Sequence, residues 1–250
     1  MQPLLKGLPK RMAILDYGLF QVHQNGRIIG ICGYVIETDA SEIVLIDTGF
    51  PPKYAVDHKA ATLEDRLDSF GQVVSLTKDN LPQAQLALLD LCMDDVDLMI
   101  QSHTHIDHIG FMDGVPGRPI LMSGAERRLQ RPLYWSGCQP MEWPEADYIL
   151  IEEDTRIGPQ FEVLSVPGHA PGQLAFQLTL PVTGAVVLTS DAISRASEID
   201  EKFVGAWDPK LALHHAKRLI ARATQHRAKL IYGHSPEQWS TLKKAPQWYV

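Results

Sequence analysis

Four potential metal ligands lie within six consecutive positions near the middle of this chain, in the run His103-x-His105-x-Asp107-His108. Three imidazoles and one carboxylate form a ligand set that borderline-soft divalent metals such as zinc favour. In an ordinary core, groups of this kind packed so closely would repel one another and lose their hydration. The run therefore predicts a hydrolytic metal centre, and it requires a fold that brings these side chains to one place.

Each potential ligand comes directly after a predicted strand. The run of four follows the short apolar segment 96–101, which we predict to be a strand. Three more predicted strands, 161–166, 185–190 and 229–232, are followed closely by further potential ligands: His169, Asp191 and His234. Sites in layered α/β proteins are built at strand ends and in the loops that follow them. Four strand ends that each supply a metal-type ligand therefore favour one shared site.

The other predicted elements complete two sheets with helices on their outer faces. Alternation and β-branched or aromatic residues predict strands over 12–22, 31–37, 43–46 and 173–180. A helical pattern covers 81–93, and a second helix begins at Asp208-Pro209 and runs to about residue 225. Residues 51–80 are polar and irregular, with a weak helical pattern at 62–70, and we interpret them as a surface insertion near or over the site. Interleaved helices and strands predict a layered α/β architecture.

Composition narrows the possible partners and the compartment. The 250 residues carry a net charge of −7 and no Lys/Arg cluster longer than a pair, so nucleic acid and an anionic membrane are not expected partners. No apolar segment has the pattern of a signal peptide or the length of a membrane span, so we expect the protein in the cytoplasm. Cys32, Cys92 and Cys138 form no paired motif, and we expect three reduced, mostly buried thiols.

The remaining histidines show no ligand spacing. His23, His58 and His226 are expected on the surface or in satisfied core positions, as is usual for an isolated histidine. His214 and His215 fall in the predicted helix that begins at Asp208, and we expect them to pack on its surface or flank. None of these five is predicted to bind a metal.

Together, the seven potential ligands resemble the full ligand signature of the metallo-β-lactamase superfamily. They occur in the order of that family, and the resemblance extends from the segment Leu45-Ile46-Asp47-Thr48-Gly49 to the C-terminus. It implies that residues 1–250 form a single domain, a four-layer αββα sandwich. It also implies a dinuclear metal site at the open edge between the two sheets.

The resemblance implies a role for each ligand. His103, His105 and His169 would bind the first metal ion, Asp107, His108 and His234 would bind the second, and Asp191 would bridge both together with a water or hydroxide. Zinc is the expected metal, with iron, manganese and cobalt as alternatives. Such an ion lowers the pKa of bound water to about 7. Asp47 is expected either to orient a ligand histidine or to have only the local role of a turn residue.

Several branches of the superfamily fit this chain poorly. True β-lactamases are secreted and tend to have Cys at the position of Asp191, flavodiiron proteins add a flavodoxin-like domain, and RNA-processing members need a basic surface or an exosite arm. Glyoxalase II-like thioesterases carry a C-terminal helical domain, whereas only residues 235–250 follow His234 here. The chain instead resembles the N-acyl homoserine lactone lactonases in the segments 102–110, 166–173, 189–192, 232–239 and 243–249.

The activity that this resemblance implies is hydrolysis of the ester bond of N-acyl homoserine lactones to the open N-acyl homoserine, a quorum-quenching reaction. The hydroxide that bridges the two metal ions alongside Asp191 would attack the carbonyl of this small-molecule substrate, and Asp107 would shuttle a proton to the leaving ring oxygen. One alternative is another hydrolase of this fold that acts on a different lactone, a thioester or a phosphoester. A second is a non-catalytic metal-binding protein, and a homodimer is left open.

One position departs from the lactonase pattern. These enzymes usually have Tyr three positions after the bridging Asp, where this chain has Ser194. We expect the oxyanion to be stabilised by Ser194, directly or through a water, or by the first metal ion alone; one such donor is typically worth ~10²–10³ in rate. Candidates for an apolar acyl groove are Phe20, Val22 and the segments 132–135 and 141–143, which fit an ordinary core or rim at least as well.

Overall fold

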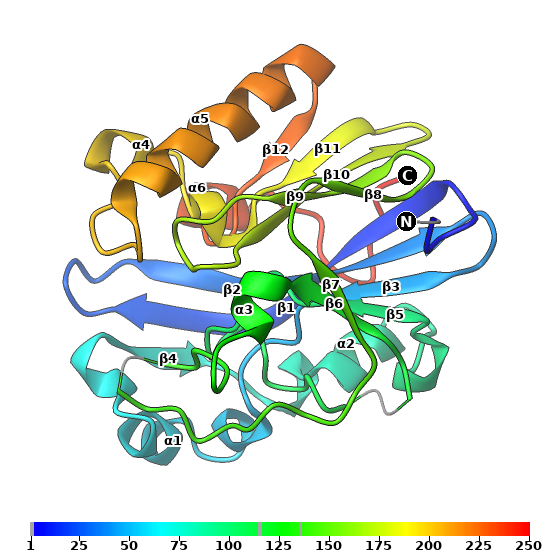
Figure 1. The fold of residues 1–250 in the computed structure, drawn as a ribbon. Helices are drawn as coiled ribbons and strands as arrows, with labels where there is room; N and C mark the ends of the chain where they lie inside the picture. Colours follow the sequence, from blue (N-terminus) through cyan, green and yellow to red (C-terminus); the bar gives the residue numbers. More distant parts are fainter. Residues whose placement is uncertain (1–2, 115–116, 136) are drawn as a thin grey trace.

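Two β-sheets stack face to face with helices on both outer sides (Figure 1). The computed structural model describes residues 3–114, 117–135 and 137–250. Helices α1 (His58–Glu64) and α2 (Pro82–Ala87) cover the outer side of one sheet, and α5 (Pro209–His226) lies along the outer side of the other. This four-layer arrangement confirms the predicted α/β fold class.

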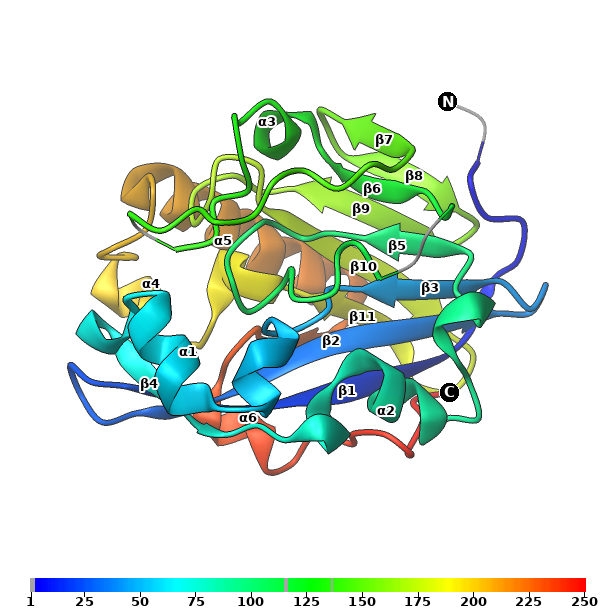
Figure 2. The ribbon, with the colours of Figure 1, turned by 90° about the horizontal axis from the view of Figure 1, so that it is seen from below.

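The first sheet contains seven strands in the order β4-β1-β2-β3-β5-β6-β7. Its β4, β1, β2 and β3 pair antiparallel, whereas β3, β5, β6 and β7 are parallel. Figure 2 shows α1 and α2 in front of this sheet. The strands are β1 (Pro9–Val22), β2 (Ile28–Thr38), β3 (Ile43–Ile46), β4 (Gly71–Ser75), β5 (Leu98–Ile100), β6 (Ile120–Ser123) and β7 (Tyr148–Ile151).

The second sheet contains five strands in the order β12-β11-β10-β9-β8, with only β12 parallel to its neighbour. Its strands are β8 (Thr155–Gly158), β9 (Phe161–Ser165), β10 (Leu174–Leu180), β11 (Gly184–Leu188) and β12 (Lys229–Ile231). The remaining helices are α3 (Gly124–Arg127), α4 (Glu198–Glu201) and α6 (Pro236–Trp239). Short 3₁₀ turns cover Pro52–Ala55, Leu67–Ser69, Lys78–Asn80, Met93–Asp95 and Ser190–Ile193. Across the described ranges, no helix has the length and apolar character that a membrane crossing needs.

Both faces of the central strands are buried. In β1, Ile14 packs between the sheets against side chains such as Phe176, whereas Leu15 faces the outer layer that contains α2. On the other side of the molecule, Ala216 and Leu219 of α5 pack on the second sheet. Strands buried on both faces read as continuous apolar runs, which is why the sequence predicts them well.

The structure adds strands that the sequence pattern did not predict. The edge strand β4 lies inside the segment 51–80, which we had interpreted as irregular, and β6, β7 and β8 were not predicted either. Each has four or five residues, and β6 and β7 are held by parallel pairing to partners that are distant in sequence. A run this short carries too few alternating positions to identify a strand by periodicity.

The helix predicted over 81–93 is shorter than expected. Helix α2 ends at Ala87, and Asp90 adopts a left-handed conformation with φ of 59°. The backbone N–H of Leu91 donates to the carbonyl of Leu86, which is the hydrogen bond of a Schellman stop. Asp tolerates the left-handed region better than most residues, so the helix ends without a glycine.

Candidate metal centre

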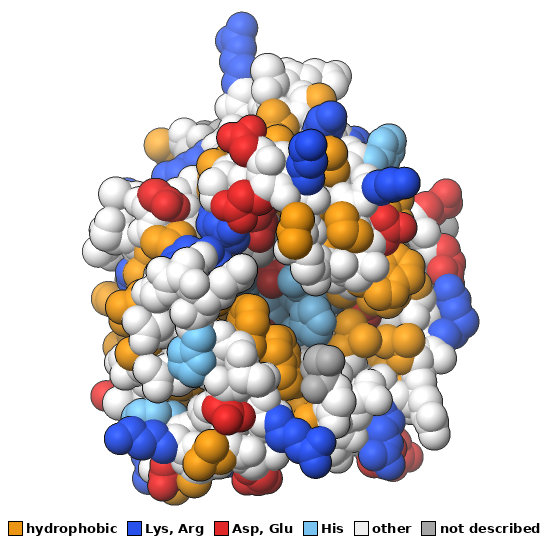
Figure 3. Space-filling view, turned by 90° about the vertical axis from the view of Figure 1, so that its left-hand side faces the viewer, with side chains coloured by type: hydrophobic (Ala, Val, Ile, Leu, Met, Phe, Trp, Pro, Cys, Tyr) orange, Lys and Arg blue, Asp and Glu red, His pale blue; other side chains and the backbone are white. Residues whose placement is uncertain are grey.

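The predicted ligands come together where strands of both sheets end. The loop after β5 supplies four of them, and the loops after β9, β11 and β12 supply His169, Asp191 and His234. Seen from the side in Figure 3, histidine side chains lie at the floor of a hollow with hydrophobic side chains around it. All seven positions predicted from the sequence therefore meet in one place.

The seven side chains form two neighbouring clusters of ligand atoms, and a third group, His103/His108/Asp191, connects the two. Within each of the groups His103/His105/His169 and Asp107/His108/His234, one ligand atom from every residue lies within 4.8 Å of the others. These are the two sets that the family resemblance implied. Asp191 joins them, because its Oδ2 lies 3.3 Å from His169 Nε2 and its Oδ1 lies 3.0 Å from His234 Nε2. The position of this carboxylate suits a bridge between two ions.

The contacts within the first group suit a metal ion. Nδ1 of His105 lies 3.0 Å from Nε2 of His103 and 2.9 Å from Nε2 of His169. A single proton on Nδ1 cannot point at both neighbours, and a neutral imidazole has only one N–H. Three converging nitrogen lone pairs are instead the donor set that divalent zinc prefers.

The second group contains buried polar atoms that lack a partner among the described residues. Nε2 of His108, Nε2 of His234 and Oδ1 of Asp191 are buried and form no hydrogen bond of good geometry there, although the last two atoms lie 3.0 Å apart. Leaving such atoms unsatisfied is costly and uncommon in native proteins. A cation coordinated by all three would remove that cost, so the residues present fit a second divalent ion.

Hydrogen bonds to the outer ring nitrogens fix the orientation of three histidines. Nδ1 of His103 lies 3.1 Å from Ser102 Oγ, Nδ1 of His108 lies 2.8 Å from Asp47 Oδ2, and Nδ1 of His234 lies 2.9 Å from the carbonyl of Gly30. In each case Nε2 is left to face the cluster. Such outer partners set the tautomer and the direction of a ligand imidazole.

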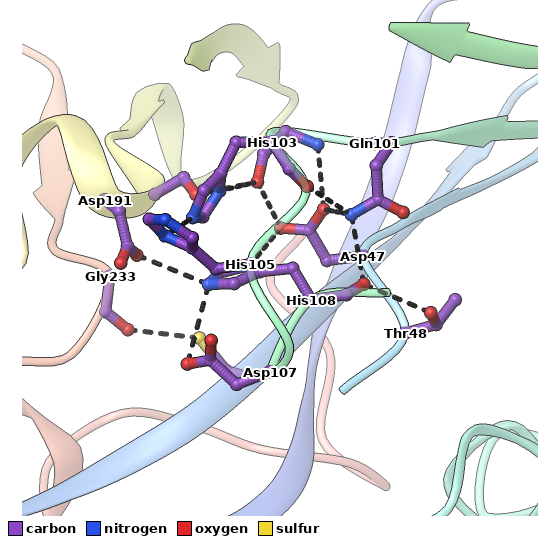
Figure 4. A network of polar contacts seen from close by, with 12 residues as sticks. Asp47, Thr48, Gln101, His103, His105, Asp107, His108, Asp191 and Gly233 are labelled. Atoms are coloured by element: carbon purple, nitrogen blue, oxygen red, sulfur yellow. Dashed lines mark hydrogen bonds and ion pairs between the residues drawn. The ribbon is translucent and has the colours of Figure 1, made fainter. Parts of the chain in front are cut away.

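Asp47 is at the centre of the network in Figure 4. Besides contacting His108, its carboxylate accepts hydrogen bonds from the backbone N–H and the hydroxyl of Ser102 and from Nε2 of Gln101. Of the two interpretations that the sequence left open, the contact with His108 is the one found. Gln101 and Ser102 were not predicted to take part in the site. The sequence signal that could have found them is a pair of polar residues directly after an apolar strand, and the structure shows that both are fully buried.

The charges in the cluster are strongly coupled. Burial, reinforced by the neighbouring His169, lowers the pKa of His105 to about 3. Burial acts in the same direction on His108, but the carboxylates of Asp107, Asp47 and Asp191 outweigh it and raise the pKa of His108 to about 10. The second group thus favours a positive charge among its carboxylates, and a divalent ion supplies one.

A cavity of about 1230 Å³ opens above the cluster. Its lining includes an aromatic stack, in which Phe20 lies 6.0 Å from Phe50 and 5.9 Å from Phe70 between ring centroids. Polar and charged residues also line it, among them Arg27, Ser194, Arg195, Glu198 and Glu201, next to the apolar Phe203, Val204 and Trp207. The cavity thus offers both apolar and polar surface to a ligand.

The acyl-groove candidates are divided by the structure. Phe20, Val22, Leu133 and Trp135 line the cavity, whereas Tyr134 is buried with its hydroxyl donating to Asp65. Met141 and Trp143 are not among the described residues that line it. The lining also includes residues that the prediction missed. Among them are Phe50, which directly precedes the segment that we had interpreted as an insertion, and Leu67 and Phe70 within that segment.

Other sequence expectations have mixed outcomes. His214 and His215 lie on α5, and neither is in a group of potential ligands among the described residues. All three cysteines are free, but only Cys32 is buried; Cys92 is exposed and Cys138 is intermediate. The expectation of mostly buried thiols is therefore wrong, because Cys92 precedes a surface turn rather than facing a core.

Comparison with known proteins supports the family assignment. The N-acyl homoserine lactonase AiiA of Bacillus thuringiensis subsp. kurstaki is 29% identical over 219 residues, which cover 86% of this chain and 85% of that protein. The lactonase AttM of Agrobacterium fabrum is 27% identical over 192 residues, covering 70% and 72%.

Solved structures show the same fold. An N-acyl homoserine lactone hydrolase with the product N-hexanoyl-L-homoserine at its catalytic metal centre matches with a TM-score of 0.84 and 25% identity, covering 97% of this chain and 100% of that one. The dizinc quorum-quenching lactonase AidC matches with a TM-score of 0.64 and 16% identity over 97% and 96% of the chains, a likeness of fold. The model of the metallo-β-lactamase superfamily matches residues 33–234. With that match over most of its length, the chain belongs to the metallo-β-lactamase superfamily.

Proposed function

We propose that this protein hydrolyses the ester bond of N-acyl homoserine lactones to the open N-acyl homoserine and thereby acts in quorum quenching. The main support is one observation: seven ligand-type side chains converge at the floor of a cavity whose lining includes both aromatic and polar residues. Relatives that bear the name lactonase, and a neighbour that holds an N-acyl homoserine at its metal centre, favour this substrate class.

The proposal includes two divalent metal ions, with zinc as the first choice and iron, manganese or cobalt as alternatives. His103, His105 and His169 would hold one, Asp107, His108 and His234 the other, and Asp191 would contact both. Bound there, the pair would acidify a bridging water, so that a hydroxide nucleophile is available near neutral pH, and would polarise the lactone carbonyl.

Asp107 is our candidate for proton transfer. Its carboxylate lines the cavity and lies 3.5 Å from Nε2 of His234, so it is part of the cluster and also accessible to a substrate. Ring opening forms a carbon–oxygen bond at the carbonyl and breaks the bond to the ring oxygen, which must gain a proton. A carboxylate that takes a proton from the attacking water can deliver it to that oxygen.

Ser194 is our candidate for a polar contact with the carbonyl. It lines the cavity three residues after Asp191, and its backbone carbonyl accepts the N–H of His234 at 2.9 Å. Its main chain is therefore tied to one of the ligand loops. A hydroxyl in this wall can donate to the carbonyl oxygen as negative charge develops on it.

The aromatic stack in the cavity lining would bind the acyl chain. Phe20 stacks on both Phe50 and Phe70, and Trp135 lies 4.9 Å from Phe70 between ring centroids. Each methylene that such a wall removes from water contributes about 0.8 kcal/mol. The same aromatic residues would exclude water from the part of the substrate where the N-acyl chain joins the lactone ring.

The test is proton release from N-butanoyl, N-hexanoyl and N-decanoyl homoserine lactone, with metal content measured on the same protein. We expect turnover by protein that holds two ions per chain, and loss of turnover after chelation. A parallel panel contains a plain γ-lactone, a thioester and a phosphodiester. Two bound ions with turnover of only one of those other esters would contradict the proposed substrate and identify a different hydrolase of this family.

A further inference from the structure

Glu126, in the short helix α3, is a buried carboxylate outside the cluster of ligands. It is 0% exposed, and among the described residues no Lys, Arg or His pairs with it. Burial raises the pKa of its carboxyl group. Placing a carboxylate in such a position is costly unless specific donors satisfy it.

The donors that satisfy Glu126 come from the two loops that carry the first group of histidines, and the backbone of Thr104 is one of them. Its Oε2 accepts a hydrogen bond from the hydroxyl of Thr104, the residue between His103 and His105. Its Oε1 accepts the backbone N–H of Gly172 at 3.1 Å, three residues after His169. One carboxylate therefore joins the loop after β5 to the loop after β9.

Close packing holds this junction in place. A Cβ atom at position 172 would lie 2.5 Å from Cγ of Glu126 and 2.7 Å from Cβ of Ser123, so only glycine lets the loop approach α3 this closely. The hydroxyl of Thr104 also accepts the N–H of Leu133 at 2.9 Å, which connects the same point to the cavity wall. The spacing of the two histidine loops is thus set from behind the cluster.

We propose that Glu126 is a positioning residue for the first metal ion. By holding Thr104 and Gly172 on one carboxylate, it keeps His103 and His105 at the distance from His169 that three-nitrogen coordination requires. It contacts none of these ligands and does not line the cavity. The inference rests on the proposed metal centre, and it concerns metal affinity rather than the identity of the substrate.

The test compares Glu126→Leu, Glu126→Gln and Thr104→Val with the wild-type protein. Each is loaded with zinc and titrated against a chromophoric chelator, and anomalous diffraction at the zinc edge shows which ion is lost. Partners behind metal ligands typically contribute 10–100-fold to metal affinity. We expect Glu126→Leu to lower the affinity for the first ion by about that factor and to leave the second ion within about threefold.

The other two variants refine the prediction. Glu126→Gln keeps an amide oxygen for the N–H of Gly172 and should lose much less affinity than Glu126→Leu. Thr104→Val removes the hydroxyl donor and keeps the backbone N–H of residue 104. It should weaken binding of the same ion, although less than Glu126→Leu does, and it keeps the test informative if the leucine variant does not fold. A matched control is Glu37→Gln, because Glu37 is also buried but pairs with Lys10 and Arg11 at the end of β2 away from Gly30.

Two results would overturn the role of Glu126. One is wild-type affinity for both ions in Glu126→Leu and Thr104→Val. The other is an equal loss of both ions together with a lower unfolding midpoint, which would indicate a general structural role. A failure of the proposed function has a different signature, since the wild-type protein itself would then bind fewer than two ions or hydrolyse none of the lactones.

Discussion

Asp191 shows how one residue can serve both halves of the centre. Burial opposes its ionisation, yet His234, His108 and His169 outweigh burial and lower the pKa of Asp191 well below its usual range. The carboxylate therefore stays charged to a lower pH than an ordinary aspartate does. A fixed negative charge between two sets of ligands lowers the repulsion between two cations held there.

Ser194 gives the first prediction at the scale of a single residue. If its hydroxyl donates to the carbonyl oxygen in the transition state, Ser194→Ala should lower kcat by about 10²-fold, the lower end of the range for one oxyanion donor. KM and metal content should change little, because the substitution removes no ligand. The measurement is steady-state kinetics with N-hexanoyl homoserine lactone alongside metal analysis.

A neighbouring serine supplies the control for that prediction. Ser197 lies on the same loop but is exposed and does not line the cavity. Ser197→Ala should therefore keep the wild-type kcat. If Ser194→Ala also kept it, the carbonyl would have to be stabilised without this hydroxyl, and the loss of the usual Tyr would be uncompensated by any side chain at this position.

At the scale of elements, the C-terminal helix α6 supports a ligand through β2. The ring of Trp239 lies directly on Gly30, where a Cβ would be 2.1 Å from a ring carbon, and the carbonyl of Gly30 holds Nδ1 of His234. Lys244 also contacts this indole, with its Nζ 4.2 Å from the ring centroid. A helix whose residues do not line the cavity thus contributes to the geometry of the second group.

We predict that Gly30→Ala and Trp239→Ala partly rescue each other. Gly30→Ala alone should overpack this contact, cost about 1–3 kcal/mol of stability and displace the carbonyl that orients His234. Adding Trp239→Ala removes the clash and should recover part of both the stability and the affinity for the second ion. Urea unfolding and chelator titration of the four proteins in the cycle measure the coupling. Strictly additive effects would contradict a direct link between the two positions.

The segment between β3 and β4 gives a prediction about chain length. Phe70 is 42% exposed and lines the cavity, so Phe70→Ala should cost little stability. It should raise KM for the decanoyl lactone by roughly 10-fold but for the butanoyl lactone by less than about twofold, because only the longer chain gains burial from this ring. Leu63→Ala, at an exposed position on α1 outside the cavity, is the matched control. Equal effects of Phe70→Ala on both substrates would place the acyl chain elsewhere.

The sequence predicted features that depend on local residue patterns better than features that depend on contacts between distant segments. The strand 43–46 was predicted to the residue, because four buried apolar residues lie between clear turn signals. The convergence of the seven candidate ligands could be predicted because residue types with metal-ligating side chains can be recognised in the sequence. Gly30, Glu126 and Phe70 were not, since their roles depend on which distant segment packs against them. Tertiary contacts of this kind leave no periodic mark in the chain.

At the scale of the whole molecule, the candidate metal ligands come from both sheets. The loop after β5 of the first sheet supplies His103, His105, Asp107 and His108, and loops of the second sheet supply His169, Asp191 and His234. Between the sheets the contacts are mainly apolar side chains of both. Two ions at the edge would therefore act as a link across the interface between the layers, in addition to their proposed role in catalysis.

This arrangement predicts that metal removal destabilises the whole fold. Ions that bind only the native state stabilise it by about 4 kcal/mol when free metal exceeds the dissociation constant 1,000-fold. For a chain of this size, that corresponds to a fall in Tm of roughly 10 °C on chelation. Differential scanning calorimetry of the zinc-loaded and chelated protein measures the change.

Asp191→Asn, which should bind metal more weakly, should start from a lower Tm and shift less. If chelation removed two ions and Tm did not move, the ions would not link the sheets, and the apolar interface alone would hold the two layers together.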